Sequence, residues 1–538
     1  MDSTCLPKDD SRPEKRAEQL ADSRDTYAYR YSWPPGVAVA ATVPHKDDYS
    51  IEYMAKIALI TAETFKNALG FANLFIKPGE LPRFLEHSLA QLATFKASEL
   101  RARFLEAHCE LAKRMTSTQP PSVESYGQLY TSIEAPPSWR QWDFDRAYAW
   151  QRVAGVNPMW LTRITAIPEH VAVGEREWLR AIGESGSLAE ALANGRVFAC
   201  DYGLLDGAPM GTTNGRKKWL PAPYAVFAAI DGDLKSVAIQ VGGKKGSPVY
   251  TPADGRSWRI AKLTVQAADA NIHEAIVHLG RTHMVMEAVA LATHRQLAER
   301  HPLSALLLPH VELTLPINNS AATSLIAPGG VIDLAFAAKI ETTAGLVKVG
   351  MDGNPLSLAS PPADLARRGL TDPSVIAEHP YRDDGLLVWA AIERFAHGYV
   401  RRYYANDADV VGDTELAAWV TELGSQEGGR LVGVARPTTV AALGDLVAII
   451  VWTGSAQHSA VNFTQFPYMG VMPNTVGALW NEWPVAGVPD DDETHVKLLP
   501  PYDMSVLQLN TVYQLSSMRM NRLGHYPLLH FRDGRVRE

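Results

Sequence analysis

Two long apolar segments that carry histidine constrain this chain of 538 residues more than any other feature. Residues 271–310 read NIHEAIVHLGRTHMVMEAVALATHRQLAERHPLSALLLPH, and residues 451–470 read VWTGSAQHSAVNFTQFPYMG. The first is strongly helical in pattern, and the second is apolar with no charged residue, which is typical of buried helices. A histidine inside such a helix needs a hydrogen-bond partner or a metal ion, because burying an unsatisfied polar group costs free energy.

The spacing of four polar residues in these segments predicts a metal site. His278 and His283 stand five apart, so in a regular α-helix they point about 140° apart and cannot share one ligand. A π-type turn would bring them onto one face, and such turns are frequent at functional sites. His458 and Asn462 stand four apart and face the same way without distortion. This nitrogen and oxygen donor set suits iron, zinc or another first-row metal; hydrogen-bonded core histidines are the alternative.

Composition argues against several other classes of protein. A net charge of −8 does not suit a nucleic-acid-binding surface. The three cysteines, Cys5, Cys109 and Cys200, are far apart, which excludes a disulfide framework or a thiolate metal cage and fits a reducing compartment. The most apolar window, residues 443–452, is interrupted by Asp445 and is shorter than the roughly 20 residues of a membrane span. With no secretory signal in the first residues, we expect a soluble, cytoplasmic protein.

Helical periodicity predicts a mainly α fold. Residues 1–48 are polar and contain prolines, so we expect a tail that wraps a domain. The only β-like part is 195–262, where short apolar runs are separated by DGD, GGKKG and ADG turn signals. We expect one large helical domain over residues 49–538 with this small β-sheet insertion. Helices are expected at residues 50–75 (with Ser50 as N-cap), 81–115, 258–301, 386–404, 414–423, 440–462 and 505–522.

Several motifs, in order along the chain, resemble those of the lipoxygenase family. WQRVAGVNPMWLTRI at 150–164 is similar to the family's QR-x-AG-x-NP segment. The two histidine segments resemble the family's two signature helices, and LPP…QL…RLGHY at 499–526 resembles the stretch beyond them. The resemblance runs from about Trp142 to the end of the chain and implies a lipoxygenase-type catalytic domain, similar to the compact bacterial members.

The resemblance also implies roles for individual residues. One non-haem iron per chain is expected on His278, His283 and His458, with Asn462 as a weaker fourth ligand. Polar residues are expected around the metal at Glu274 and Gln465, and the substrate pocket is expected to include Ala321 and Leu325. His273 matches a signature histidine that is not an iron ligand. Alanine at 321 goes with S-type oxygenation in the family, although the next residue, Ala322, replaces the family's usual arginine.

The implied activity is the insertion of O2 into a polyunsaturated fatty acid of the linoleate or arachidonate type. Iron accepts an electron as hydrogen leaves the methylene between two cis double bonds, and O2 then adds to give a hydroperoxide. Two alternatives stay open at this point. One is a catalytically impaired fatty-acid-binding protein, and the other is a hydroperoxide isomerase that uses the same iron.

Two parts of the chain depart from the family pattern. Residues 50–115 read as helical where plant and animal members begin with a β-barrel domain, so we expect that domain to be absent. Such helices leave a peripheral membrane contact open, although core packing is the simpler expectation. The chain ends RLGHYPLLHFRDGRVRE, without the terminal isoleucine whose carboxylate binds the metal in the family, so we expect a truncated end with one ligand fewer. The oligomeric state is open.

Overall fold

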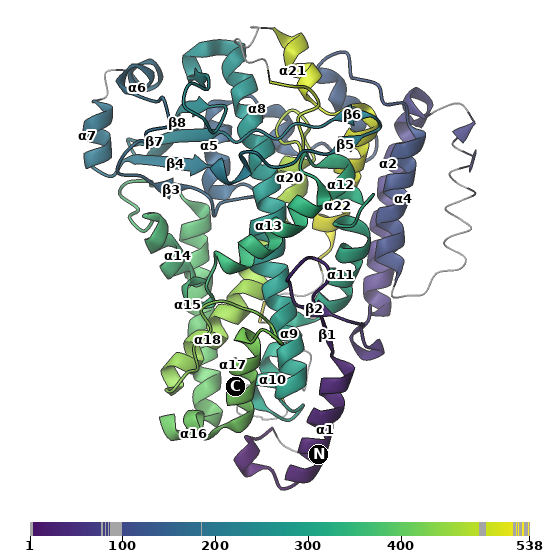
Figure 1. Cartoon of the computed structure of the whole chain (residues 1–538), viewed down its shortest axis with the longest axis vertical. Coiled ribbons are helices and arrows are strands. Elements are labelled where there is room, and N and C mark those ends of the chain that lie inside the picture. Colours follow the sequence, from purple (N-terminus) through teal and green to yellow (C-terminus); the bar gives the residue numbers. More distant parts are fainter. Residues whose placement is uncertain are drawn as a thin grey trace.

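The fold is mainly α-helical with a small five-stranded sheet, as the sequence predicts, and two further two-stranded ladders (Figure 1). The computed structural model describes residues 4–76, 99–183, 186–483 and 491–519, with isolated residues between 79 and 86 and between 523 and 536. The sheet lies at one end of the molecule, and helices build the rest. Residues 87–98 of the helix expected over 81–115 lie outside the described residues.

A single long helical segment runs through the middle of the molecule (Figure 1). It consists of α8 (Gly255–Ile272), a π-helix η8 (His273–His283) and α9 (Met284–Gln296). Almost every side chain from Ser257 to Thr293 is buried. A helix covered on all sides must be apolar around most of its circumference, which accounts for the weak amphipathic pattern of this segment.

Two groups of helices flank the central segment. On one side, α15 (Pro380–Tyr403) packs along α18 (Val440–Trp452), which continues through a π-helix η12 (Thr453–Gln457) into α19 (His458–Asn462). On the other side, α2 (Ile51–Phe75), α4 (Leu100–Arg114) and α22 (Tyr502–Ser517) pack against one another. The Oγ atom of Ser50 accepts the Tyr53 N–H at 3.1 Å, which confirms Ser50 as the cap of α2.

Four of the five strands of the sheet lie in the region that the turn signals predict, 195–262, and the edge strand β3 lies before it. Its strands are antiparallel in the order β3 (Thr162–Arg163), β4 (Val197–Asp201), β7 (Tyr224–Ile230), β8 (Asp233–Gln240) and β9 (Val249–Tyr250). Asp231 and Gly232 both have positive φ, of 54° and 84°, and join β7 to β8 in a tight hairpin. The helices α5 (Asp145–Ala154) and α6 (Glu175–Ile182) pack against β8.

The N-terminal residues have more structure than the expected tail. They form α1 (Pro13–Thr26) and a small ladder of β1 (Tyr29–Arg30) with β2 (Val39–Ala40), and α1 packs on α9. The Arg16 guanidinium binds Glu415 at 2.5 Å. Only Arg16 and Leu20 of α1 are buried, so the helix has no apolar stripe that the sequence could reveal. The domain boundary at residue 48 stays a prediction.

Shorter elements connect these parts. The sequence predicts α17 within one residue of its observed bounds but does not predict most of the other short elements as separate helices. The observed elements are α7 (Leu188–Ala193), α10 (Pro302–Leu307), α11 (Thr314–Ser320), a π-helix η10 (Ala321–Leu325), α12 (Val331–Ala335), α13 (Ile340–Asp352), α14 (Pro361–Arg368), α16 (Asp407–Gly412), α17 (Thr414–Gly424), α20 (Gln465–Met469), α21 (Asp492–Leu498) and the two-residue strands β5 (Thr212–Thr213) and β6 (Arg216–Lys217).

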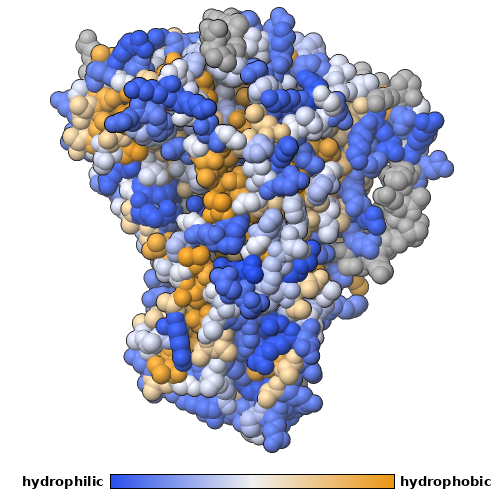
Figure 2. All heavy atoms as spheres, viewed as in Figure 1, coloured by the Kyte–Doolittle hydropathy of each residue, from blue (hydrophilic) through white to orange (hydrophobic). Residues whose placement is uncertain are grey.

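The surface is mixed in polarity. On the face that Figure 2 shows, hydrophilic residues prevail, and hydrophobic ones gather in a band down the middle. Among the described residues, one helical stretch, Val440–Met469, is long and apolar enough to cross a membrane by length and composition alone. Within its most apolar window, 56% of the residues are buried inside the protein, as in the core helix of a domain.

Candidate metal centre

The π-helix η8 brings its histidines onto one face, as the five-residue spacing predicts. His278 and His283 have ring centroids 4.8 Å apart, and the ring of His273, five residues earlier, stacks on His278 at 5.4 Å. In an α-helix these side chains would diverge by about 140°, whereas the wider π turn aligns every fifth residue. The unusual helix geometry is therefore what makes the pair usable as joint ligands.

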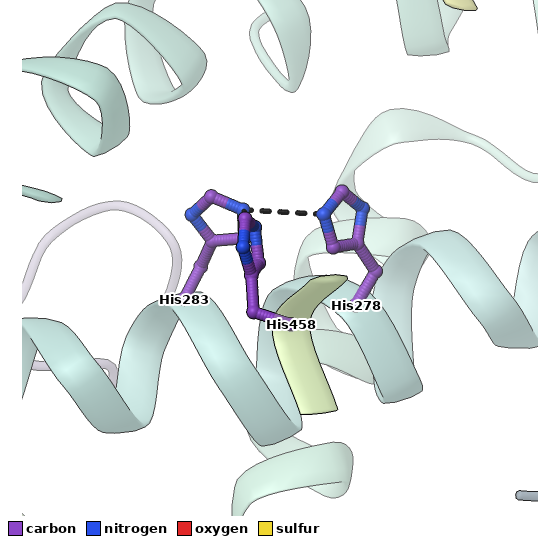
Figure 3. Close-up of side chains that lie close together, drawn as sticks. All are labelled: His278, His283 and His458. Carbon is purple, nitrogen blue, oxygen red and sulfur yellow. Dashed lines mark hydrogen bonds between the residues drawn. The ribbon is translucent and has the colours of Figure 1, made fainter. Parts of the chain in front are cut away.

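A third imidazole arrives from a distant part of the chain. His458 is the first residue of α19, which packs against η8. Its Nε2 lies 3.0 Å from the Nε2 of His283, and the Nε2 of His283 lies 3.2 Å from that of His278 (Figure 3). Three ring nitrogens thus converge on one point from two helices.

Asn318 on α11 fixes the tautomer of His283. Its Oδ1 lies 2.7 Å from the Nδ1 of His283, while its Nδ2 donates to the Glu287 carboxylate at 2.8 Å and to the His283 carbonyl at 3.1 Å. Because the two Nδ2 contacts orient the amide, Oδ1 accepts a hydrogen bond from the Nδ1–H of His283. The Nε2 lone pair of His283 therefore points to the convergence point, which is the usual arrangement around a metal-binding histidine.

Glu274 and Gln465 hold His278 from the other side. The Nδ1 of His278 lies 3.4 Å from Oε2 of Glu274 and 3.0 Å from Nε2 of Gln465 on α20. Gln465 also donates to Glu274 at 3.2 Å. The two predicted polar residues are thus placed against the imidazole, and both are buried.

Burial keeps the three imidazoles neutral. Desolvation lowers the pKa of His278 and of His458 well below the ordinary value for histidine. It lowers the pKa of His283 to about 3, with a smaller contribution from the charge of His278. Burial also raises the pKa of the Glu274 carboxyl. Neutral imidazole is the form that binds a metal, so the ligands are ready without the cost of removing a proton.

The geometry fits a first-row metal ion. Ligands about 2.1 Å from such an ion and at right angles to each other stand about 3.0 Å apart, and the measured nitrogen separations are 3.0 and 3.2 Å. A second candidate group, of His273, Glu274 and His278, is fully buried. There the Nε2 of His273 is bonded to the carbonyl of Val461 at 2.9 Å, and its Nδ1 lies 3.7 Å from the Glu274 carboxylate. All three histidines of the first group line the adjacent cavity, whereas His273 does not, which favours the first group.

A cavity of about 730 Å³ opens beside the three histidines. Asn462, one helical turn after His458, lines this cavity, as do the predicted pocket residues Ala321 and Leu325 of η10. Its walls are otherwise mainly apolar and include Leu279, Leu313, Ile317, Val388, Phe463 and Leu515. The roles of Asn462, Ala321 and Leu325 remain predictions, although their positions agree with them.

Arg101 on α4 brings a positive charge to the same cavity. Its Nη1 donates to the hydroxyl of Tyr53 at 2.9 Å, and the rings of Tyr53 and Tyr49 stack at 4.6 Å. Among the described residues, no carboxylate forms an ion pair with Arg101. The sequence offers no signal for Arg101 or for Asn318, because nothing in their local patterns connects them to the histidine helices.

Comparison with known proteins identifies the family. The lipoxygenase family model matches residues 135–510, well over half of the chain. The chain belongs to the lipoxygenase family. A linoleate 9/13-lipoxygenase of Pseudomonas aeruginosa is 38% identical over 76% of this chain and 61% of its own length. A polyunsaturated fatty acid lipoxygenase of Rattus norvegicus is 34% identical over 73% of this chain and 59% of its own length.

A solved lipoxygenase structure shows the same fold over nearly the whole chain. This crystal structure, in complex with arachidonate, superposes with a TM-score of 0.81 at 25% identity and covers 96% of this chain and 74% of its own. The chain spans about 60% of the length of the two curated relatives it matches. The prediction of a lipoxygenase-type helical domain is therefore confirmed.

Proposed function

We propose that this lipoxygenase-family chain is a non-haem iron dioxygenase that converts polyunsaturated fatty acids to hydroperoxides. One observation carries the proposal: the neutral imidazole nitrogens of His278 and His458 lie 3.2 and 3.0 Å from that of His283, on the wall of a mainly apolar cavity of about 730 Å³. A nitrogen-rich site without thiolate suits a redox-active iron, and the apolar walls suit an acyl chain.

In this proposal His278, His283 and His458 hold the iron, with Asn462 as a fourth, weaker ligand. Bound there, iron would supply the one-electron oxidation that hydrogen abstraction from a pentadiene methylene requires. The chain's own contribution is to fix the ligands. Asn318 holds the Nδ1 proton of His283, and the pair Glu274 and Gln465 holds the ring of His278.

The cavity suggests how a fatty acid would lie. Arg101 provides a cation without a carboxylate partner among the described residues, so it is suited to bind the carboxylate of the substrate. Apolar side chains such as Leu325 and Ile317 would then hold the acyl chain beside the histidines and keep water away from it. The names of the relatives support this substrate class, since one acts on linoleate and another is solved with arachidonate.

The test combines metal content with turnover. The purified chain should contain iron, and it should consume O2 and produce conjugated-diene absorbance when linoleate is added. His458→Ala should lose both the iron and the activity. The control His45→Ala, at an exposed histidine of the short helix η2 (His45–Asp47), should lose neither. Unchanged iron and O2 uptake in His458→Ala would contradict the proposed centre.

The same measurements separate the two alternatives. Bound iron without O2 uptake or diene formation would indicate a fatty-acid-binding protein. Loss of an added fatty-acid hydroperoxide without O2 uptake would indicate an isomerase. Both results would keep the metal site but overturn the dioxygenase proposal.

A further inference from the structure

A second group of metal-type ligands lies between α15 and α18, away from the three histidines. Glu393 and His397 stand four apart on α15, and Asp445 comes from α18. One ligand atom of each lies within 4.8 Å of the ligand atoms of the other two. Glu393 and His397 are half-buried and Asp445 is exposed, so an ion can reach the group from solvent.

Gly444, the residue before Asp445, sets the position of the His397 ring. A Cβ atom built on Gly444 would lie 2.7 Å from Nδ1 of His397, so the ring rests directly on the backbone of α18. Its Nε2 is 2.9 Å from Oδ1 of Asp445. This contact is a hydrogen bond, and the ligands of a tetrahedral zinc ion stand roughly 3.3 Å apart, so a small movement of either side chain would admit the ion. A side chain larger than hydrogen at residue 444 would displace the ring from this place.

The charges in the group also favour a cation. Two carboxylates within 4.8 Å of each other repel unless something neutralises them. Within the described part of the chain, Glu393 forms no ion pair with a basic residue, so its charge is available. A divalent ion would neutralise both carboxylates at once, and the imidazole would supply the third donor.

We propose that Glu393, His397 and Asp445 form a divalent-cation site that joins α15 to α18. One imidazole nitrogen and two carboxylate oxygens suit Zn²⁺ or a similar first-row ion better than Ca²⁺, which takes six or more oxygen ligands. The two helices that this site would join also contribute to the histidine centre and its cavity. α18 leads through η12 to His458, and Val388 of α15 lines the cavity beside the histidines. The site does not depend on the dioxygenase proposal.

The test counts metals on the iron-loaded protein, so that the histidine centre is already filled. After equilibration with Zn²⁺ at neutral pH, we expect one zinc per chain in addition to the iron, measured by mass spectrometry of the metals. His397→Ala should lose this zinc and keep the iron. Asp445→Asn, which changes an exposed side chain, should weaken zinc binding at least tenfold, and His45→Ala should leave it unchanged.

Two further results bear on the proposal. Zn²⁺ should raise the melting temperature of the wild-type protein but not that of His397→Ala, and Gly444→Ala should weaken zinc binding by moving the ring. The proposal is overturned if no zinc binds beyond the iron, or if His397→Ala binds it as tightly as the wild type. It is also overturned if zinc binds only as iron is lost, since the ion would then occupy the histidine centre.

Discussion

Replacing Asn318 tests whether the tautomer of His283 controls metal binding. Asn318→Ala removes the acceptor that lies 2.7 Å from Nδ1 of His283. The loss of such a partner typically weakens metal binding by about 10- to 100-fold, which corresponds to about 1.4 to 2.7 kcal/mol. We therefore expect the dissociation constant for iron, measured by competition with a chelator, to rise by this factor.

The same substitution should also destabilise the fold. Asn318 donates to the buried carboxylate of Glu287 at 2.8 Å, and burial already raises the pKa of Glu287 to about 7. Leaving a buried polar group without its partner costs about 1 to 3 kcal/mol. Urea unfolding of the metal-free protein measures this loss separately from the loss of iron affinity.

Two variants make the result interpretable. Asn319→Ala removes the neighbouring side-chain amide on α11 and should keep the wild-type iron affinity. The hydroxyl of Thr323 donates to the backbone carbonyl of Asn319, so the substitution leaves that hydrogen bond in place. Asn318→Asp keeps an acceptor for Nδ1 of His283 and should retain more iron affinity than Asn318→Ala. If the folded Asn318→Ala protein binds iron as tightly as the wild type, the tautomer argument is refuted.

Three further predictions concern substrate, product and pH. Arg101→Leu should raise KM for free linoleate about tenfold or more, since a charge-assisted hydrogen bond is worth about 1.5 to 3 kcal/mol. It should leave KM for the methyl ester of linoleate unchanged. An equal rise in KM for both substrates would exclude carboxylate binding by Arg101. Ala321→Gly should increase the R fraction of the hydroperoxide, measured by chiral chromatography, because it removes the methyl group from the cavity wall; an unaltered S excess would contradict this role. Stability should fall as the pH drops below about 6.5, the ordinary pKa of an imidazole. Burial lowers the pKa of His108 to about 4 and that of His495 to about 3, so only the unfolded chain binds these protons. Each group should remove about 1.4 kcal/mol per pH unit in this window, and denaturant midpoints that do not change with pH would refute the prediction.

The sequence predicts the parts of the site that depend on local spacing. His278 and His283 could be paired because a five-residue interval has a meaning within one helix, and His458 and Asn462 because four residues make one turn. The long buried helices were predicted for the same reason, since periodicity is a local property. The positions of Glu274 and Gln465 followed from the resemblance to the family, and the structure places both against His278.

The parts that spacing cannot predict come from contacts between distant segments. Asn318 reaches His283 across 35 residues of chain, and Arg101 on α4 precedes His278 by 177 residues (278 − 101). Neither side chain belongs to a periodic pattern, so only the packing of α11 and α4 around the cavity brings it there. The sequence does not predict the helix α1 for another reason. Its surface is polar almost all round, so its sequence is similar to that of a solvated segment.

The π-helix makes the length of the central segment as important as its composition. A deletion of one residue between His278 and His283 would convert the π turn to α spacing, and both the imidazoles and α9 would keep their faces. A deletion between His283 and Glu287 falls in regular α-helix and would rotate the rest of α9 by about 100° relative to the histidines. Glu287 would then turn away from Asn318 and from the backbone of Ala40, which it now binds at 2.8 Å each. The segment should therefore accept many conservative substitutions but not the loss of a residue after His283, because the register of α9 aligns Glu287 with the residues that hold the metal ligands.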